Sequence, residues 1–221
     1  MNEKEARNKI AKNAKKYMGV RGGTKAHHRI INTFNKVKPQ GYTAKYSDPW
    51  CSEFASAMAI ETFGEKTAKK YFPLSASCPR MIEEAKKKNI WVEKDSYKPN
   101  VGDFILYDWQ DSGKGDNKNT PDHVGIVKSC KDGKIHVIEG NCGNKVSTRV
   151  LPVNGKYIRG FVTPRYDKIA DKKKTVTQIA NEVINGKWGV GQDRKEKLTA
   201  AGYDYDQVQH KVNDLLKKET E

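Results

Sequence analysis

One cysteine of the sequence lies where a nucleophile could be activated. Cys51 follows Asp48-Pro49-Trp50, and this segment predicts a helix start with Asp48 as the N-cap and Pro49 at the first helical position. The dipole and unpaired N–H groups of a helix N-terminus favour a thiolate, and the same N–H groups can hold a developing oxyanion. A small buried core residue is the alternative interpretation of Cys51.

A thiolate nucleophile needs a general base, and the base needs a partner that orients it. The histidines that could act as this base are His27, His28, His123, His136 and His210. His123 opens a predicted strand, Glu139 ends the next one, and Asn141 lies two residues beyond it. Taken alone, His123 could be a turn residue and Glu139 a surface residue. Together with Cys51, the pattern favours catalysis.

The contact between His123 and Glu139 depends on the register of the predicted hairpin. With a five-residue loop at 129–133, His123 lies directly across from Glu139 on the same face, within reach of an imidazole–carboxylate hydrogen bond. A tight Asp132-Gly133 turn would shift the pairing and move Glu139 away. The sequence leaves both turns open, so the contact is expected only if the longer loop forms.

The elements around these residues predict an α+β domain. Apolar periodicity predicts helices over 3–18, from Asp48 onward and over 77–89, whereas 19–39 is a polar stretch. From residue 90 the pattern becomes that of short strands, and helices followed by strands indicate an antiparallel sheet. The expected strands lie near 90–93, 103–109, 123–128, 134–139, 145–151 and 157–162. The segment 110–122, just before His123, is the longest irregular stretch in this region.

The C-terminal part of the chain predicts a separate small module. Residues 167–174 (DKIADKKK) are a predicted charged linker, so the first domain is expected over 1–166 and the module over 175–218. Capping boxes begin at Thr175 and Asp204. We expect three short helices that form a small bundle, at about 175–185, 192–201 and 205–217.

The net charge of +15 is unevenly distributed over the 221 residues. Residues 1–174 carry 35 basic and 19 acidic side chains, and residues 175–221 carry 7 and 8. This division predicts that only the first part attracts a polyanion, whether nucleic acid, an anionic membrane or an anionic cell wall. No apolar run is long enough for a membrane helix, and the four cysteines form no CxxC pair, which disfavours a zinc finger.

Four motifs in the first part, taken in order, resemble those of the CHAP family, the cysteine, histidine-dependent amidohydrolases/peptidases. The motifs are WCSEF at 50–54, PNVGDF at 99–104, DHVGIV at 122–127 and IEGN at 138–141. The resemblance implies a papain-like fold and peptidoglycan hydrolysis, with Cys51 as nucleophile, His123 as base, Glu139 orienting His123 and Asn141 supporting the site. The pair Gly102-Asp103 is expected to serve structure.

Some CHAP enzymes carry an acidic calcium-binding loop just before the nucleophile. Here the segment 41–48 holds a single carboxylate, Asp48, and a lysine. Calcium takes six to eight oxygen ligands, so we predict no calcium site there, and no other metal or cofactor.

The tail resembles one repeat of the Cpl-7-type (CW_7) cell-wall-binding module. The resemblance covers nearly all of 175–216 and implies a three-helix bundle that binds the muramyl-peptide part of peptidoglycan. On physical grounds Arg194 could bind a carboxylate or carbonyl, and Trp188, Tyr203 or Tyr205 could stack on a sugar. Core packing is the alternative interpretation for the three aromatic residues.

These features predict a bacteriolytic enzyme, most like a phage endolysin, that cleaves an amide or peptide bond of peptidoglycan. A bacterial autolysin with the same chemistry and a catalytically inactive wall-binding protein are the alternatives. The lysines follow no nucleic-acid-binding motif, so we expect no specific nucleic-acid partner.

The N-terminus, MNEKEARNKIAKNAKK, has no apolar stretch of the signal-peptide type. We therefore expect synthesis in the host cytoplasm, action on the wall after release, and free thiols. Because a single repeat binds weakly, attraction to teichoic acids or self-association is expected to add affinity.

Overall fold

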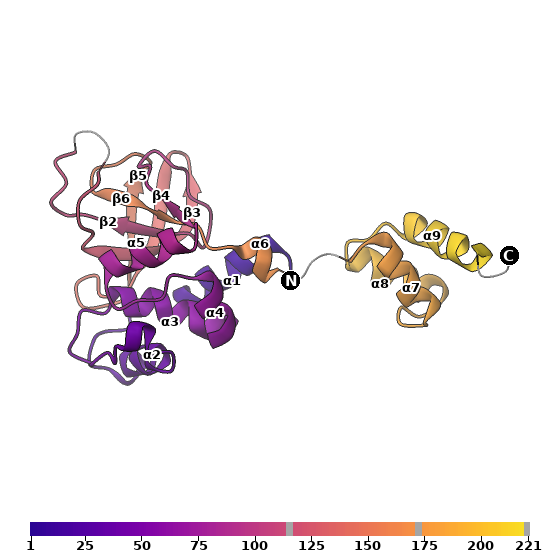
Figure 1. Ribbon diagram of the computed structural model, residues 1–221, viewed down its shortest axis with the longest axis horizontal. Coiled ribbons are helices and arrows are strands. Elements are labelled where there is room, and N and C mark those ends of the chain that lie inside the picture. Colours follow the sequence, from indigo (N-terminus) through magenta and orange to yellow (C-terminus); the bar gives the residue numbers. More distant parts are fainter. Residues whose placement is uncertain (114–116, 171–173, 219–221) are drawn as a thin grey trace. The chain divides into compact units, whose positions relative to one another are not determined.

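The structure is a computed structural model that describes residues 1–113, 117–170 and 174–218. The chain divides into two compact units, residues 1–171 and residues 172–221. The first unit is an α+β domain and the second consists of helices (Figure 1). The α+β class and the C-terminal helices predicted from the sequence are therefore confirmed.

The helices of the first unit come mostly before its strands. They are α1 (Glu3–Lys16), α2 (Lys25–Asn35), the short 3-10 helix η1 (Pro39–Gly41), α3 (Cys51–Phe63), α4 (Glu65–Tyr71), α5 (Cys78–Lys87) and α6 (Tyr166–Ile169). Figure 1 shows α2, α3 and α4 on one side of the sheet. Helices α1 and α3 contact the sheet through β3 and β4. Helix α3 is buried around almost its whole circumference, as its apolar sequence predicts.

The sheet has six antiparallel strands in the order β1-β6-β2-β3-β4-β5. The strands are β1 (Trp91–Val92), β2 (Phe104–Tyr107), β3 (His123–Lys131), β4 (Lys134–Glu139), β5 (Ser147–Pro152) and β6 (Ile158–Val162). The central strand β2 is buried on both faces. Phe104 and Leu106 pack toward the helices, and Ile105 and Tyr107 belong to a second apolar cluster on the opposite face.

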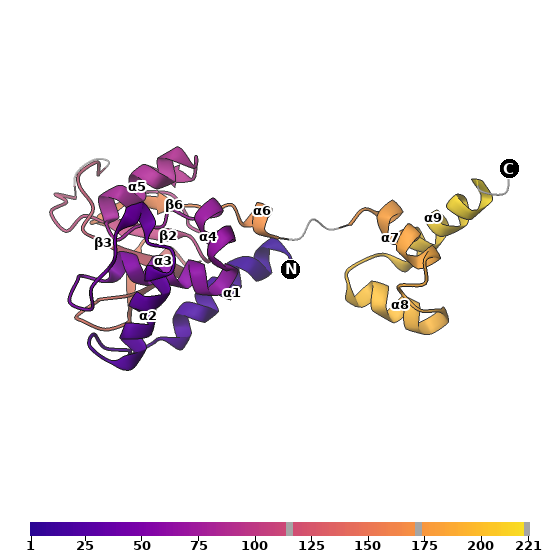
Figure 2. The same ribbon diagram turned by 60° about the horizontal axis from the view of Figure 1, so that its bottom comes forward.

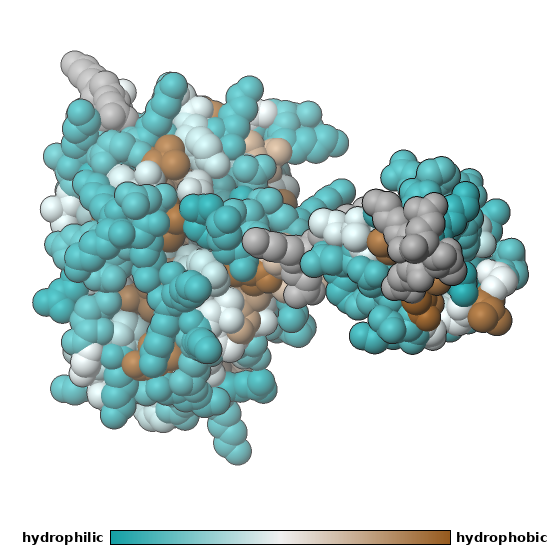
Figure 3. All heavy atoms as spheres, turned by 45° about the vertical axis from the view of Figure 1, so that its right-hand side comes forward, coloured by the Kyte–Doolittle hydropathy of each residue, from teal (hydrophilic) through white to brown (hydrophobic). Residues whose placement is uncertain are grey.

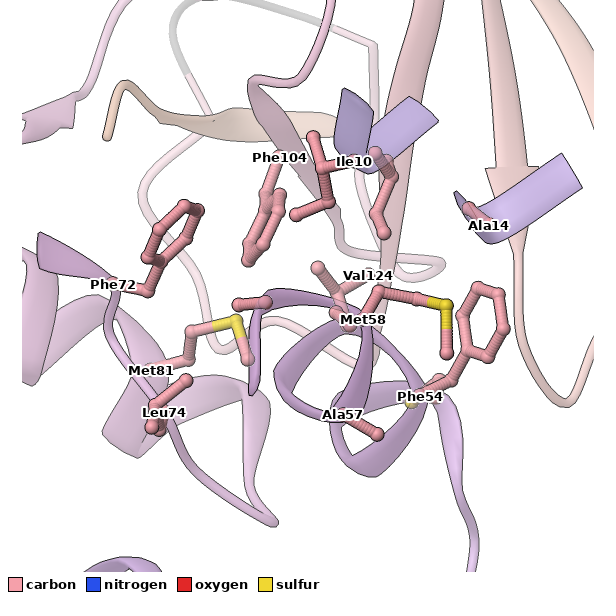
Figure 4. Packing of buried hydrophobic residues seen from close by; sticks show 14 of the residues in the cluster. Ile10, Ala14, Phe54, Ala57, Met58, Phe72, Leu74, Met81, Phe104 and Val124 are labelled. Atoms are coloured by element: carbon pink, nitrogen blue, oxygen red, sulfur yellow. The ribbon is translucent and has the colours of Figure 1, made fainter. Parts of the chain in front are cut away.

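The main core fills the space between the helices and the sheet (Figure 4). Phe54 and Met58 of α3 lie beside Ile10 of α1, and Val124 of β3 reaches the same cluster. This packing sets the position of α3 relative to β3. It therefore sets the position of Cys51, the first residue of α3, relative to His123, the first residue of β3.

Two expectations about the N-terminal half are wrong. The polar stretch 19–39 contains α2, whose buried Ile30, Ile31 and Phe34 form an apolar stripe among polar residues. Helix α3 begins at Cys51 without a side-chain cap, so Asp48 is not its N-cap. The Asp48 carboxylate instead accepts from the Lys45 N–H and the Tyr42 hydroxyl and closes the preceding turn.

The β3–β4 hairpin forms the tighter of the two turns that the sequence left open. Lys131 pairs with Lys134, so Asp132 and Gly133 form the tight two-residue turn that was the alternative. Both turn residues have positive φ, as a primed hairpin turn requires. The register then shifts between Val127 and Ser129, and Glu139 pairs with Gly125 rather than with His123.

The second unit contains α7 (Val176–Ile184), α8 (Gly191–Ala200) and α9 (Tyr205–Lys218), which Figure 2 shows from a second side. Thr175 caps α7 in a capping box with Gln178, as the sequence predicts. The three helices share a small apolar core of Ile179, Ala180, Val183, Leu198, Val208 and Val212.

The predicted linker 167–174 overlaps helix α6. Tyr166 is fully buried, and its hydroxyl donates to the Gly102 carbonyl, so α6 packs on the first unit. A Cβ on Gly102, which has a φ of +85°, would lie 2.7 Å from that hydroxyl. The carboxylate of Asp103 is buried and accepts from Arg7, Tyr97 and the Asn100 N–H, consistent with a structural role. Residues 171–173 of the linker and 114–116 of the segment 110–122 lie outside the described residues.

The visible face in Figure 3 is mostly hydrophilic, and its hydrophobic residues form small separate groups. Over the parts of the chain that the structure describes, we find no helix with the length and apolar character needed to cross a bilayer.

Candidate active site

Cys51 lies in the first turn of α3, as predicted, although it is the first residue of the helix, a position that the sequence assigned to Pro49. Its side chain is almost buried, with 7% of the residue exposed. The first backbone hydrogen bond of the helix runs from the Phe54 N–H to the Trp50 carbonyl. The N–H groups of Cys51 and Ser52 precede this bond and belong to the open end of the helix. The thiol therefore lies beside the positive end of the helix dipole.

His123 and Glu139 are in contact although the hairpin has the tight turn, which was expected to move Glu139 away. The His123 Nε2 lies 3.2 Å from Glu139 Oε2. The two residues are diagonal neighbours, and Gly125 stands between them, opposite Glu139. A Cβ on Gly125 would lie 2.8 Å from Glu139 Cγ, so the missing side chain of this glycine leaves room for the carboxylate to reach His123.

A second cation holds the other oxygen of Glu139. Arg149, on β5, donates from Nε to Glu139 Oε1 at 2.7 Å. The guanidinium lies over the Trp109 ring at 4.8 Å, and Trp109 stacks on Tyr107. The Tyr107 and His123 rings are nearly parallel, with centroids 5.8 Å apart. Glu139 is thus fully buried and oriented from two sides.

The protonation states follow from these contacts. Burial lowers the pKa of His123, but the hydrogen bonds and charges of Cys51 and Glu139 outweigh burial and raise this pKa to about 9. Burial raises the pKa of Glu139, and His123 and Arg149 lower it to about 2. The pKa of Cys51 lies well below that of an ordinary thiol, because hydrogen bonds from Cys78 and His123 outweigh its burial. At neutral pH the arrangement favours a Cys51 thiolate beside a His123 imidazolium.

The remaining ring nitrogen of His123, Nδ1, is available for Cys51, because Nε2 contacts Glu139. The structure therefore brings together Cys51, His123 and Glu139. Asn141 lies in the turn after β4 with a φ of 57°. Among the described residues, its side chain makes no hydrogen bond to Cys51 or His123.

The other histidines lie elsewhere. His27 is buried against Trp50, with ring centroids 4.8 Å apart, and its Nδ1 accepts from the Gly23 N–H. His28 stacks on Tyr46. His136 lies within β4, and His210 is an exposed neighbour of Asp214 on α9.

A pocket of about 390 Å³ lies beside the start of α3. Asp48, Glu53, Ser77 and Arg80 are among its lining residues. Only 1% of Glu53 is exposed, and its Oε2 has no hydrogen-bond partner among the described residues. Burial, and more weakly the charges of Cys51 and Asp48, raise the pKa of Glu53 to about 8.

No group of three or more His, Cys, Asp or Glu side chains among the described residues has an arrangement that could hold a metal ion. All four cysteines are free thiols.

Three residues of this site were not among the sequence predictions, namely Arg149, Trp109 and Cys78. Arg149 is one basic residue in a strand of alternating polarity, and only the pairing of β5 with β4 brings it near Glu139. Cys78 was predicted only as part of the start of a helix. Its contact with Cys51 depends on how α3 and α5 pack, for which the sequence gives no local signal.

In the second unit, the four candidate wall-binding residues are partly buried. The rings of Trp188, Tyr203 and Tyr205 pack against the apolar core of the unit, which supports the packing interpretation for part of each ring. Arg194 donates from Nε to the Gly189 carbonyl and from a terminal nitrogen to Gln209. These bonds hold the guanidinium against the loop between α7 and α8.

Comparison with known proteins identifies two families. Residues 41–141 match the CHAP domain, and residues 177–216 match the CW_7 repeat. Over 42 residues the chain is 55% identical to the lysozyme of Streptococcus phage Cp-7, a match that spans 19% of this chain and 12% of that lysozyme. No solved structure matches significantly. The chain therefore contains a CHAP domain, followed by a CW_7 repeat.

Proposed function

We propose that the chain is a bacteriolytic peptidoglycan hydrolase of the endolysin type, in which Cys51 cleaves an amide or peptide bond. The observation that carries this proposal is the set of contacts that joins Cys51, His123 and Glu139 at the start of α3. The combination of a CHAP domain with a CW_7 repeat, and the similarity to a phage protein named lysozyme, support the same function.

The first half of the reaction is acyl transfer to Cys51. The thiolate attacks the carbonyl carbon, and the carbonyl oxygen becomes an oxyanion near the open N–H groups of α3. The tetrahedral intermediate collapses when His123 donates its Nδ1 proton to the leaving nitrogen. The C–N bond breaks, a free amine leaves, and a thioester remains on Cys51.

The second half is hydrolysis of the thioester. His123, now neutral, accepts a proton from a water molecule that attacks the thioester carbonyl. The C–S bond breaks, a carboxylic acid leaves, and Cys51 returns to the thiolate. Glu139 keeps the ring of His123 in place and stabilises its cation, while Arg149 keeps the Glu139 carboxylate ionised.

For the second unit, we propose binding to the muramyl-peptide part of peptidoglycan through Arg194 and the exposed parts of Trp188, Tyr203 and Tyr205. The bonds of Arg194 to Gly189 and Gln209 use only part of the donor capacity of its guanidinium. The remaining N–H groups suit a carboxylate or carbonyl of the ligand. Attraction of the basic first unit to wall teichoic acids would add to the affinity.

The experiment that tests this function is digestion of purified cell walls, followed by mass spectrometry of the released fragments. The wild-type protein should release fragments with new amines and carboxylic acids. Their masses distinguish an N-acetylmuramoyl–L-alanine amidase from an endopeptidase. Cys51→Ala and His123→Ala should release none while still binding walls, and Cys130→Ala is the matched cysteine control. Fragment release by Cys51→Ala at the wild-type rate would refute the proposal.

Wall binding is measured separately by co-sedimentation of the Cys51→Ala protein with insoluble walls. In this background, Arg194→Ala should weaken binding, and Lys187→Ala, an exposed basic residue of the same unit, is the control. Equal losses in both variants would indicate that Arg194 contributes only charge.

A further inference from the structure

A second cysteine lies beside the proposed nucleophile. Cys78, the first residue of α5, has its Sγ 3.9 Å from the Sγ of Cys51. Both side chains are buried, with 7% of Cys51 and 5% of Cys78 exposed. Cys78 lies at the start of a helix of its own, so helix position alone does not say which sulfur carries the charge.

The surrounding contacts distinguish the two sulfurs. His123 forms a hydrogen bond with Cys51, whereas the side-chain contacts of Cys78 are with Cys51 and Ser52. Ser52, the residue after Cys51, has its Oγ 3.1 Å from the Cys78 Sγ. A consistent chain of donors then runs from the Ser52 hydroxyl to the Cys78 sulfur, and from the Cys78 S–H to the Cys51 thiolate.

We propose that Cys78 is a positioning residue, whose S–H donates to the Cys51 thiolate and holds it in place, and that Ser52 orients Cys78. The proposal rests on the proposed function only in taking Cys51 as the nucleophile. A thiol normally donates weakly, but a charged acceptor strengthens the bond. The two pKa values agree with this direction, because that of Cys51 is well below and that of Cys78 well above the ordinary value.

Other titratable groups also act on Cys51. His123 on β3 stabilises the thiolate, and Glu53, in the first turn of α3, opposes it through its negative charge when ionised. Replacing His123 would remove the proposed base together with the ion pair. Cys78 can be replaced while the base stays in place, so Cys78 is the residue to test.

The test is the pH dependence of alkylation of Cys51 by iodoacetamide in the full-length protein, followed by peptide mass spectrometry. Cys78→Ala should raise the midpoint by about one pH unit, which lowers the rate about tenfold at pH values below both midpoints. Cys78→Ser retains a donor, so its midpoint should stay closer to that of the wild type. Ser52→Ala should raise the midpoint by a smaller amount.

Cys130→Ala, a cysteine of β3 that does not contact Cys51, is the matched control and should leave the midpoint unchanged. Thermal unfolding identifies any variant that fails to fold, in which case Cys78→Ser and Ser52→Ala carry the test. Equal midpoints for folded Cys78→Ala and the wild type would overturn the proposal, as would faster alkylation of Cys78 than of Cys51. Alkylation requires no substrate, so a protein that shows these shifts but does not digest walls would refute the proposed function alone.

Discussion

Replacing Glu139 by Gln tests how the His123 cation is maintained. The carboxylate of Glu139 touches His123 at 3.2 Å and Arg149 at 2.7 Å, and it is fully buried. Gln has nearly the same shape and can still accept from His123, but it carries no negative charge. The substitution therefore removes the charge and leaves the packing nearly unchanged.

The magnitude follows from the strength of one charge-assisted hydrogen bond, about 1.5–3 kcal/mol. Because Arg149 already shares the charge of Glu139, we take the lower end, which corresponds to about one pH unit. The pKa of His123, about 9 in the wild type, should then fall to about 8 in Glu139→Gln. Loss of transition-state stabilisation of the same size lowers kcat/KM by about tenfold, so some activity remains.

The assay is the pH profile of kcat/KM for wall lysis, with Glu65→Gln on the exposed surface of α4 as the control. The leaving amine requires a protonated His123, so the alkaline limb of the profile should move to lower pH in Glu139→Gln and stay in place in the control. NMR titration of His123 measures the same pKa without substrate. An alkaline limb that does not move, or a His123 pKa unchanged by the substitution, would show that the Glu139 charge does not maintain the His123 cation.

Four further predictions follow from the structure. Gly125→Ala places a Cβ 2.4 Å from Val137 and 2.8 Å from Glu139, which should break the hydrogen bond from Glu139 that orients His123. Lysis should therefore fall at least tenfold, while wall binding, measured by co-sedimentation, is retained. Glu53 has a pKa raised from 4.5 to about 8, so burying its charge costs stability that grows as pH rises through this range. Glu53→Gln should therefore stabilise the fold by on the order of 5 kcal/mol near pH 9 and by less than about 1 kcal/mol near pH 5, measured by urea unfolding. Equal gains at the two pH values would contradict the assignment. Chelators should leave lysis unchanged, whereas inhibition by EDTA that calcium reverses would reveal a metal requirement. Residues 1–171 alone should lyse walls at low salt and lose most of this activity by about 0.5 M NaCl, because charge attraction is screened over a few ångströms at that salt concentration. The full-length protein should lose less activity. If the fragment is inactive at every salt concentration and light scattering shows oligomers of the full-length protein, self-association is favoured instead.

The sequence predicts the elements of this fold better than their ends and pairings. The apolar residues of α3 and α5 and the alternating strands after residue 90 are strong local signals, and the structure has these elements. Helix α2 was missed because its apolar stripe is short and its other residues are polar and basic. The start of α3 was placed too early, because Asp48 and Pro49 form a good cap by composition but close a turn instead.

The site was predicted in part. Cys51, His123 and Glu139 were identified from their places at the ends of elements. The contact between His123 and Glu139 was expected only with the longer loop, because a bulge after Val127 and the small size of Gly125 were not visible in the pattern. The contact of Arg149 with Glu139 joins two strands, β5 and β4, and the contact of Cys78 with Cys51 joins two helices, α5 and α3. Only the tertiary structure brings them together.

In the proposed mechanism, Cys51 forms a covalent acyl-enzyme with a fragment of the bacterial wall. Rapid acid quenching of the protein during wall digestion, followed by mass spectrometry of its peptides, measures this directly. The mechanism predicts a wall-fragment adduct on the peptide that contains Cys51, released by hydroxylamine as expected of a thioester and absent in Cys51→Ala. Wall digestion by Cys51→Ala at the wild-type rate, or an adduct on another residue in its place, would contradict it.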